Sequence, residues 1–309
     1  MHAPKGQIRL GVDLGGTKIE AALLDESGNF LRRERVSNPG QYADIRSAIA
    51  ELCDGIEAAE GLAHRSLPLG IGTPGSVSAR TGLMRNCNST QLNGRNFPRD
   101  LQCSTQRAVR VANDADCFTL SEARDGAARG LGTVFGVILG TGVGGGIALA
   151  STPMHGANRI AGEWGHNRMP LERCRDLPPT LQSGARRCYC GELDCVEVWL
   201  SGPGLAQTHQ DLHGTVIDEQ ALHCGDIAGA LESTLEAYCE LAGAALAGVV
   251  NTIDPDAIVL GGGLSNVDYL YSRLPGVIAQ QVFSDCFSTP ILRPRFGDSS
   301  GVRGAAWLW

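Results

Sequence analysis

The chain has 309 residues, 43% hydrophobic and 19% charged, which is an ordinary globular composition for one large domain or two medium ones. Its net charge of −7 argues against a broad surface for nucleic acid or for an anionic membrane. No apolar run reaches the roughly 18 residues of a membrane-spanning helix, and no signal-like segment precedes the first predicted strand, so we expect a cytoplasmic location.

The N-terminal part of the chain predicts three strands joined by tight turns. The strands are expected at 8–14, 19–25 and 30–36, and GGTK (15–18) and ESGN (26–29) form the turns between them. A helix is expected at 43–61. Two further strands are expected at 68–75, where the strand runs into a glycine turn, and at 109–116, where it runs into a polar turn.

The strand–glycine turn–strand pattern recurs later, with a strand at 133–140, a glycine turn at 141–146 and a new strand from 147. Apolar residues at helical spacing predict a helix over 227–250, and AIVLGGG (257–263) predicts a strand that runs into a third glycine turn. Strands alternating with helices, together with the repeated hairpin, predict an α/β protein of two related lobes with a cleft between them. We expect a small lobe at 1–117, with a C-terminal helix (about 295–309) packed on it, and a large lobe at 118–294.

Neither glycine turn fits a P-loop or a dinucleotide-binding fingerprint. The pattern G-x-x-x-x-G-K-[ST] is absent, and both turns lead into strands instead of into a helix. A glycine turn between two strands can still bind phosphate oxygens through its backbone N–H groups. Two such turns, with the third glycine run at 261–263, indicate a nucleotide cleft.

Five motifs carry a resemblance to a known family: DLGGTK (13–18), NDAD (113–116), GTGVGGG (140–146), GEWGH (162–166) and CYCGELDCVEVWLSG (188–202). In this order, from about residue 8 to the C-terminus, the chain resembles the ROK family of sugar kinases and related repressors. The resemblance implies an actin/hexokinase-like (ribonuclease H-like) two-lobed fold, with ATP and a sugar bound in the interlobe cleft.

The resemblance also implies the residues that bind ATP and Mg²⁺. Asp13 would orient Mg²⁺, most plausibly through water, and the two phosphate loops and the nucleoside contact would be formed by glycine-rich segments. The implied residues are Asp13, Gly15, Gly16, Thr17 and Lys18 in the first loop, Gly140, Thr141, Gly142, Gly144 and Gly145 in the second, and Gly261 and Gly262 near the nucleoside.

Phosphoryl transfer to an alcohol needs an in-line hydroxyl and a carboxylate that accepts its proton. NDAD follows a predicted strand, where an aspartate is also a common helix N-cap. By resemblance, Asp114 is the base and Asn113 binds a sugar hydroxyl, and we assign Asp116 to the N-cap. Further sugar contacts are implied at six positions: Gly75, Ser76, Asn88, Thr90, Glu163 and Glu197.

The segment CYCGELDC (188–195) admits a disulfide framework, a redox pair, a metal knuckle or a coincidence in a cysteine-rich chain. Its C-x-C spacing is tighter than the usual C-x2–4-C of zinc sites, so the spacing alone leaves the question open. By resemblance, His166, Cys188, Cys190 and Cys195 hold a structural Zn²⁺, and the nearby Cys174 does not. This metal would fix the segments that carry Glu163 and Glu197, and His166 would face the sugar as well as the metal.

The implied reaction is ATP-dependent phosphorylation of a free hexose at its 6-hydroxyl. NSTQLNG (88–94) and GDSSGVRGAAWLW (297–309) look most like bacterial fructokinases, which favours D-fructose or mannose. Glucose kinases and N-acetylhexosamine kinases share the remaining motifs and are the alternatives. A repressor would carry a helix-turn-helix domain before the first strand, where only seven residues stand, and a non-catalytic sugar-binding or zinc-binding module is opposed by the intact Asn113–Asp114 pair. A homodimer is a family-level expectation.

Overall fold

The structure, a computed structural model, describes residues 7–182, 185–217 and 229–309, which form two compact units. The first unit comprises the chain up to Arg129, Gly146–Ala161 and Asp298–Trp309, and the second comprises Gly130–Gly145 and Gly162–Gly297. Helix α3 (Asp114–Arg124) lies wholly in the first unit, whereas the sequence-based boundary at residue 117 falls inside it. The division at 117 and the interlobe cleft stay predictions.

The first unit is built on a five-stranded sheet with the order β3-β2-β1-β4-β7. β1 pairs antiparallel with β2, and β2 with β3, while β1, β4 and β7 run parallel to one another. The strands lie where the sequence predicts them, within three residues: β1 (Arg9–Leu14), β2 (Lys18–Leu24), β3 (Phe30–Ser37), β4 (Leu69–Thr73) and β7 (Val109–Asn113).

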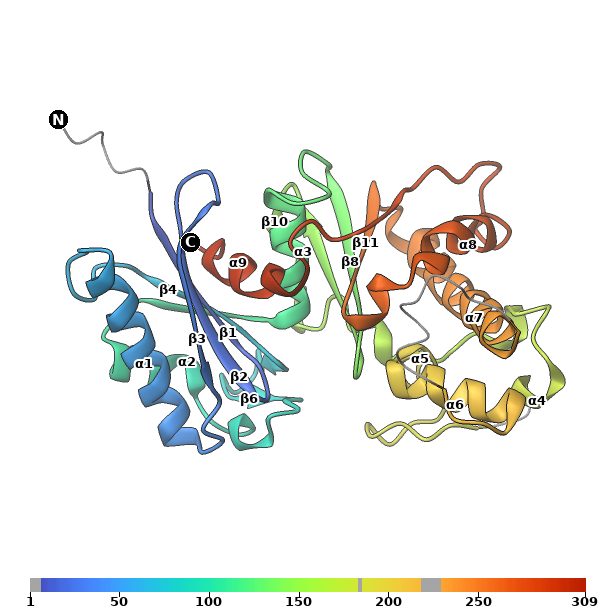
Figure 1. The fold of residues 1–309 in the computed structure, drawn as a ribbon, viewed down its shortest axis with the longest axis horizontal. Helices are drawn as coiled ribbons and strands as arrows, with labels where there is room; N and C mark the ends of the chain where they lie inside the picture. The colour runs from blue at the N-terminus through green and yellow to red at the C-terminus, as the bar shows by residue number, and fades with distance from the viewer. Residues whose placement is uncertain (1–6, 183–184, 218–228) are drawn as a thin grey trace. The chain divides into compact units, whose positions relative to one another are not determined.

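Helices α1 (Tyr42–Ala59), α2 (Phe97–Thr105) and α9 (Ser300–Ala306) pack around this sheet together with α3. Glycines let α9 lie directly on its neighbours, because a Cβ added at Gly70 of β4 would overlap Ala305 O, and one added at Gly304 would overlap Cys117 O. In Figure 1, α9 (red) accordingly runs beside β1 and α3. Residues from both ends of the sequence therefore build one core.

The second sheet repeats the scheme of the first, with the order β10-β9-β8-β11-β12. In each sheet three consecutive strands lie side by side, and two later strands follow in parallel. The strands are β8 (Thr133–Leu139), β9 (Val143–Leu149), β10 (Thr152–Pro153), β11 (Ala257–Gly261) and β12 (Ile291–Leu292). The strand after the second glycine turn begins at Val143, earlier than the predicted residue 147.

The remaining helices of the second unit include one that the sequence predicts and several that it does not. Helix α7 (Ala230–Ile253) matches the periodic segment 227–250, of which residues 227 and 228 lie outside the described residues. The helices not predicted are α5 (Val196–Leu200), α6 (Gly202–His213) and α8 (Asp268–Ala279). None of the helices in the described ranges has both the length and the hydrophobicity of a membrane-spanning segment.

Candidate functional site

The first glycine turn joins β1 to β2 and is held at its base. Gly15 N–H donates to Lys18 O at 3.0 Å, and the Asn38 side-chain amide donates to Gly15 O at 2.8 Å. Asn38 N–H donates to Thr17 O at 2.9 Å. Gly16 and Thr17 are exposed at the tip of this turn. The turn is therefore rigid at its base and open at its tip, as a phosphate-binding loop requires.

Asp13, the last polar residue of β1, lies close to the end of β7 although β4 separates the two strands. Burial raises the pKa of Asp13 to about 7, and the negative charges of Asp114 and Glu20 add to this effect. Lys18 and Arg35 act in the opposite direction. Two neighbouring carboxylates, one half-buried and one exposed, form a site whose repulsion a divalent cation would relieve.

Asn113 and Asp114 lie at the junction of β7 and α3. The Asn113 side chain caps the helix, because its Oδ1 accepts a hydrogen bond from Ala115 N–H at 2.8 Å. The same N–H also lies 2.8 Å from Asp114 Oδ1. The assignment of the N-cap to Asp116 is wrong: Asp116 lies inside the first turn of α3, and its Oδ2 faces His155 Nδ1 at 3.4 Å.

One of the predicted sugar loops contacts Asn113, and the second lies next to the first. The Asn113 side-chain amide donates to Gly75 O at 3.1 Å, and Gly75 has a positive φ of 79°. A Cβ at Gly75 would lie 2.6 Å from Cys87 Sγ, so the loop that carries Asn88 and Thr90 starts next to Gly75. Ser76 follows in the short strand β5 (Ser76–Val77), and Asn88 and Thr90 are exposed. The first unit thus brings Gly75 to Asn113 at the end of β7, and the segment that carries Asn88 and Thr90 begins beside Gly75.

The second glycine turn lies between β8 and β9 in the second unit. Gly140 N–H closes it by donating to Gly142 O at 3.0 Å. Gly261 ends β11 and pairs with Ile138 of β8, and Gly262 then turns with φ 79°, where a Cβ would overlap Leu139 O. The predicted nucleoside glycines are therefore adjacent to the predicted phosphate turn.

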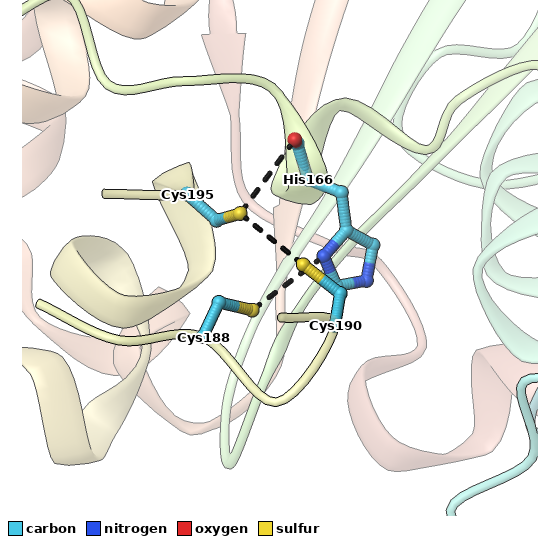
Figure 2. A group of neighbouring side chains, drawn as sticks. All are labelled: His166, Cys188, Cys190 and Cys195. Carbon is cyan, nitrogen blue, oxygen red and sulfur yellow. Dashed lines mark hydrogen bonds between the residues drawn. The ribbon is translucent and has the colours of Figure 1, made fainter. Parts of the chain in front are cut away.

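The four predicted metal ligands converge in the second unit, as Figure 2 shows. Cys188 Sγ lies 3.7 Å from His166 Nδ1, and Cys190 Sγ lies 3.5 Å from Cys195 Sγ. All four ligand atoms lie within 4.8 Å of one another. Tetrahedral zinc with these ligand types needs separations of about 3.5–3.8 Å between ligand atoms. The residues fit a zinc ion.

Two neighbours of this cluster clarify its chemistry. Cys174 is buried apart from it, where its thiol approaches Pro170 O and Glu240 O, so its exclusion from the ligand set agrees with the structure. Tyr189, which sequence reasoning missed, places its hydroxyl 3.1 Å from His166 Nε2. Burial and the charge of Glu197 raise the pKa of Tyr189 to about 12, so the phenol stays protonated. The sequence signal for Tyr189 was its position between the two predicted ligands Cys188 and Cys190.

Glu163 and Glu197 flank the cluster. Glu163 directly precedes η2 (Trp164–His166), the short helix that ends in the ligand His166. Glu197 lies in α5, two residues after Cys195, and its Oε2 accepts a hydrogen bond from Val143 N–H at 3.3 Å. Glu197 therefore touches the second glycine turn, a contact that the sequence did not predict. Both glutamates belong to the second unit, whereas Asp13 and Asp114 belong to the first.

A cavity of about 600 Å³ opens beside the second glycine turn. Thr141 and Glu197 contribute to its wall, together with residues of α5, α6 and the loop before the cysteine cluster. Arg186, in this wall, stacks on the Trp199 ring at 3.7 Å and bonds Asp211, so its charge is already compensated. Arg187, Glu197 and Asp211 also line the cavity, so the wall beside the turn carries charges of both signs.

Comparison with known proteins identifies the architecture. The family model described as "ROK family" matches residues 9–309. The chain belongs to the ROK family. This confirms the family predicted from the motifs and, with it, the actin/hexokinase-like fold.

The similarity to individual ROK proteins extends over the whole chain. This chain is 38% identical over 303 residues to an N-acetylgalactosamine kinase of Shewanella sp., and the match covers 96% of this chain and 95% of that protein. It is 36% identical to an N-acetyl-D-glucosamine kinase of Photobacterium profundum, and this match covers 96% of this chain and 98% of that protein. A ROK glucokinase structure from Streptomyces griseus, in complex with glucose and AMPPNP, is 26% identical, with a TM-score of 0.76 and coverage of 98% and 99%. The prediction of a ROK-family sugar kinase is confirmed.

Proposed function

We propose that this ROK-family sugar kinase transfers the γ-phosphoryl group of ATP to the 6-hydroxyl of an N-acetylhexosamine. The observation that carries the proposal is the similarity, over 96% of the chain, to kinases of N-acetylgalactosamine and N-acetyl-D-glucosamine. The preference for fructose rested on the segments 88–94 and 297–309 alone. Fructose is the weaker candidate, because both curated relatives named above are N-acetylhexosamine kinases, and the similarity covers 95% and 98% of their own lengths.

In this proposal the first unit activates the acceptor. Asp114 accepts the proton of the 6-hydroxyl, and Asn113 binds another hydroxyl of the sugar with Gly75, Ser76, Asn88 and Thr90 around it. The charge of Asp114 contributes to the raised pKa of Asp13, and this proximity supports a cation site that the two carboxylates share. Mg²⁺ bound there would neutralise negative charge on the phosphates. The first glycine turn holds phosphate oxygens through backbone N–H groups.

The second unit holds the rest of both substrates. Glu163, Glu197 and His166 bind sugar hydroxyls, since carboxylates accept the hydrogen bonds that hydroxyls donate. The second glycine turn and the glycines at 261–262 bind the nucleotide, for which AMPPNP stands in as an ATP analogue in the glucokinase relative. Zinc at the cysteine cluster is structural, because four protein ligands leave no open coordination position. A cytoplasmic homodimer is part of the same proposal.

A coupled ADP-release assay across a sugar panel tests this function. Purified protein is assayed with MgATP against N-acetylglucosamine, N-acetylgalactosamine, N-acetylmannosamine, glucose, mannose and fructose. We expect the highest kcat/KM with an N-acetylhexosamine, by about tenfold or more over fructose. A higher kcat/KM for fructose or mannose would restore the fructokinase assignment, and no turnover with any sugar would reject kinase activity.

A further inference from the structure

The second glycine turn is held by the segments that carry the four predicted zinc ligands. Three backbone groups of the turn are engaged from outside. Gly140 O accepts from Gly202 N–H at 2.7 Å, Val143 N–H donates to Glu197 at 3.3 Å, and Gly144 O accepts from the Trp164 indole N–H at 2.9 Å. Trp164 stands two residues before the ligand His166, and Glu197 stands two residues after the ligand Cys195.

Packing reinforces these hydrogen bonds on the side of His166. Trp164 is 5% exposed, and its ring meets Phe135 of β8 edge-on with centroids 5.8 Å apart. A Cβ at Gly145 would lie 2.6 Å from Trp164 Cδ1, and a Cβ at Gly165 would overlap Val143 O. The segment from Trp164 to His166 therefore lies flat against the backbone of the turn, with no room for a side chain between them.

Glu197 reaches the same turn from the side of the cysteines. A Cβ at Gly142 would lie 2.9 Å from Glu197 Oε2, so this carboxylate fills the space next to the turn. Ser201 N–H donates to Glu197 O at 3.1 Å, and the next residue, Gly202, donates its N–H to Gly140 O. The chain thus passes from Cys195 through α5 to the turn within a few residues.

We infer that the Cys3His cluster fixes the nucleotide's phosphate turn through Trp164 and Glu197, and that Trp164 is a positioning residue for nucleotide binding. A backbone turn binds phosphate only while its N–H groups point to one place, and every group that holds it reduces the entropy lost on binding. The cluster therefore positions the turn that binds the nucleotide as well as the neighbouring carboxylates, Glu163 and Glu197, that bind the sugar. This inference rests on the proposed function, which assigns the turn to phosphate.

Trp164→Phe tests the inference with the smallest change, because it keeps a buried ring and removes the indole N–H. The measurement is the affinity for MgADP, by calorimetry without sugar, in protein whose zinc content is determined by atomic emission. We expect about one zinc per chain and MgADP binding weaker by about fivefold or more, since Gly144 O loses its buried donor. Trp309→Phe is the matched control, because the Trp309 indole N–H has no hydrogen-bond partner among the described residues; its affinity should be unchanged.

A second variant separates the metal from the tryptophan. Cys190 is exposed, so Cys190→Ser removes one ligand with little change in packing, and it should lower both the zinc content and the MgADP affinity. The inference is overturned if Trp164→Phe binds MgADP like the wild type, or if zinc-free Cys190→Ser does so. The proposed function fails separately, namely if wild-type protein that binds MgADP phosphorylates no sugar in the panel.

Discussion

At the scale of single residues, substitutions of Asp114 and Asp116, two aspartates of the first turn of α3, are predicted to have different effects. Asp114 lies at the start of α3 next to the helix cap, and Asp116 lies two positions further into the same turn with His155 as its partner. The family resemblance assigned the base to Asp114, but the role that the sequence suggested for Asp116, the helix N-cap, belongs to Asn113. The structure gives them different surroundings, which makes each the control for the other.

Asp114→Asn should lower kcat by about 100-fold or more, because the amide cannot accept the proton of the sugar hydroxyl. Its oxygen can still accept the hydrogen bond from Ala115 N–H, so the helix and the affinity for sugar should be retained. The measurement is steady-state kinetics with the preferred sugar, alongside calorimetric sugar binding. Asp116→Asn should keep kcat near that of the wild type. Near-normal turnover of Asp114→Asn would remove this residue from the role of base.

Asp13 makes stability depend on pH. Its pKa is raised to about 7 in the folded protein, so between the ordinary value of about 4 and pH 7 the folded state keeps a proton that the unfolded state has lost. Stability is therefore lost as pH rises through this window. Asp13→Asn removes the cost and should raise Tm by about 3 °C or more at pH 8, with a smaller gain at pH 5.

The measurement for Asp13→Asn is thermal denaturation by circular dichroism, without nucleotide or Mg²⁺. Turnover should be lost in the same variant, because the carboxylate next to Asp114 is gone. An equal change in Tm at both pH values would show that ionisation of Asp13 is not the cause.

At the scale of elements, α9 approaches Asp13, the residue proposed to orient Mg²⁺, as well as the sheet. A Cβ at Gly301 would lie 2.8 Å from Asp13 Oδ2, inside the distance that two unbonded atoms tolerate. The sequence suggests that the segment 297–309 around Gly301 marks the sugar preference. The structure indicates a different role for Gly301, since the absence of a side chain there leaves room for the Asp13 carboxylate.

Gly301→Ala should therefore displace the Asp13 carboxylate and lower kcat by about tenfold, with a higher Mg²⁺ requirement. Gly55→Ala is the matched control, because Gly55 also lies in a helix of the first unit, and nothing lies within 4 Å of an added Cβ there. Alanine favours helices over glycine, so the control should be equally active and slightly more stable. Steady-state kinetics across a Mg²⁺ titration and thermal denaturation measure both effects. Equal kinetics of the two variants would show that Asp13 tolerates the methyl group.

At the scale of the whole molecule, the sequence predicted what depends on local patterns. Strands β1 to β4, β7, β8 and β11, together with α7, were accessible, because strand alternation and helical spacing are local signals. The short strands β10 and β12 were not predicted. The four metal ligands followed from the family resemblance, because the C-x-C spacing alone left the kind of site open. Helices α5 and α6 were missed because a short helix interrupted at Gly202 shows little periodicity. The contacts of Glu197 and Trp164 with the second glycine turn join segments far apart in sequence, and no single-sequence pattern reports such contacts.

The position of α9 has a consequence for how the protein folds. The first unit is discontinuous in sequence, since α9 packs on β1, β4 and α3 but follows the whole second unit along the chain. During synthesis, β1 and β4 therefore emerge long before the helix that covers them. The core of the first unit can close only after the ribosome has translated the second unit, and until then one face of its sheet is an apolar surface open to chaperones and to aggregation.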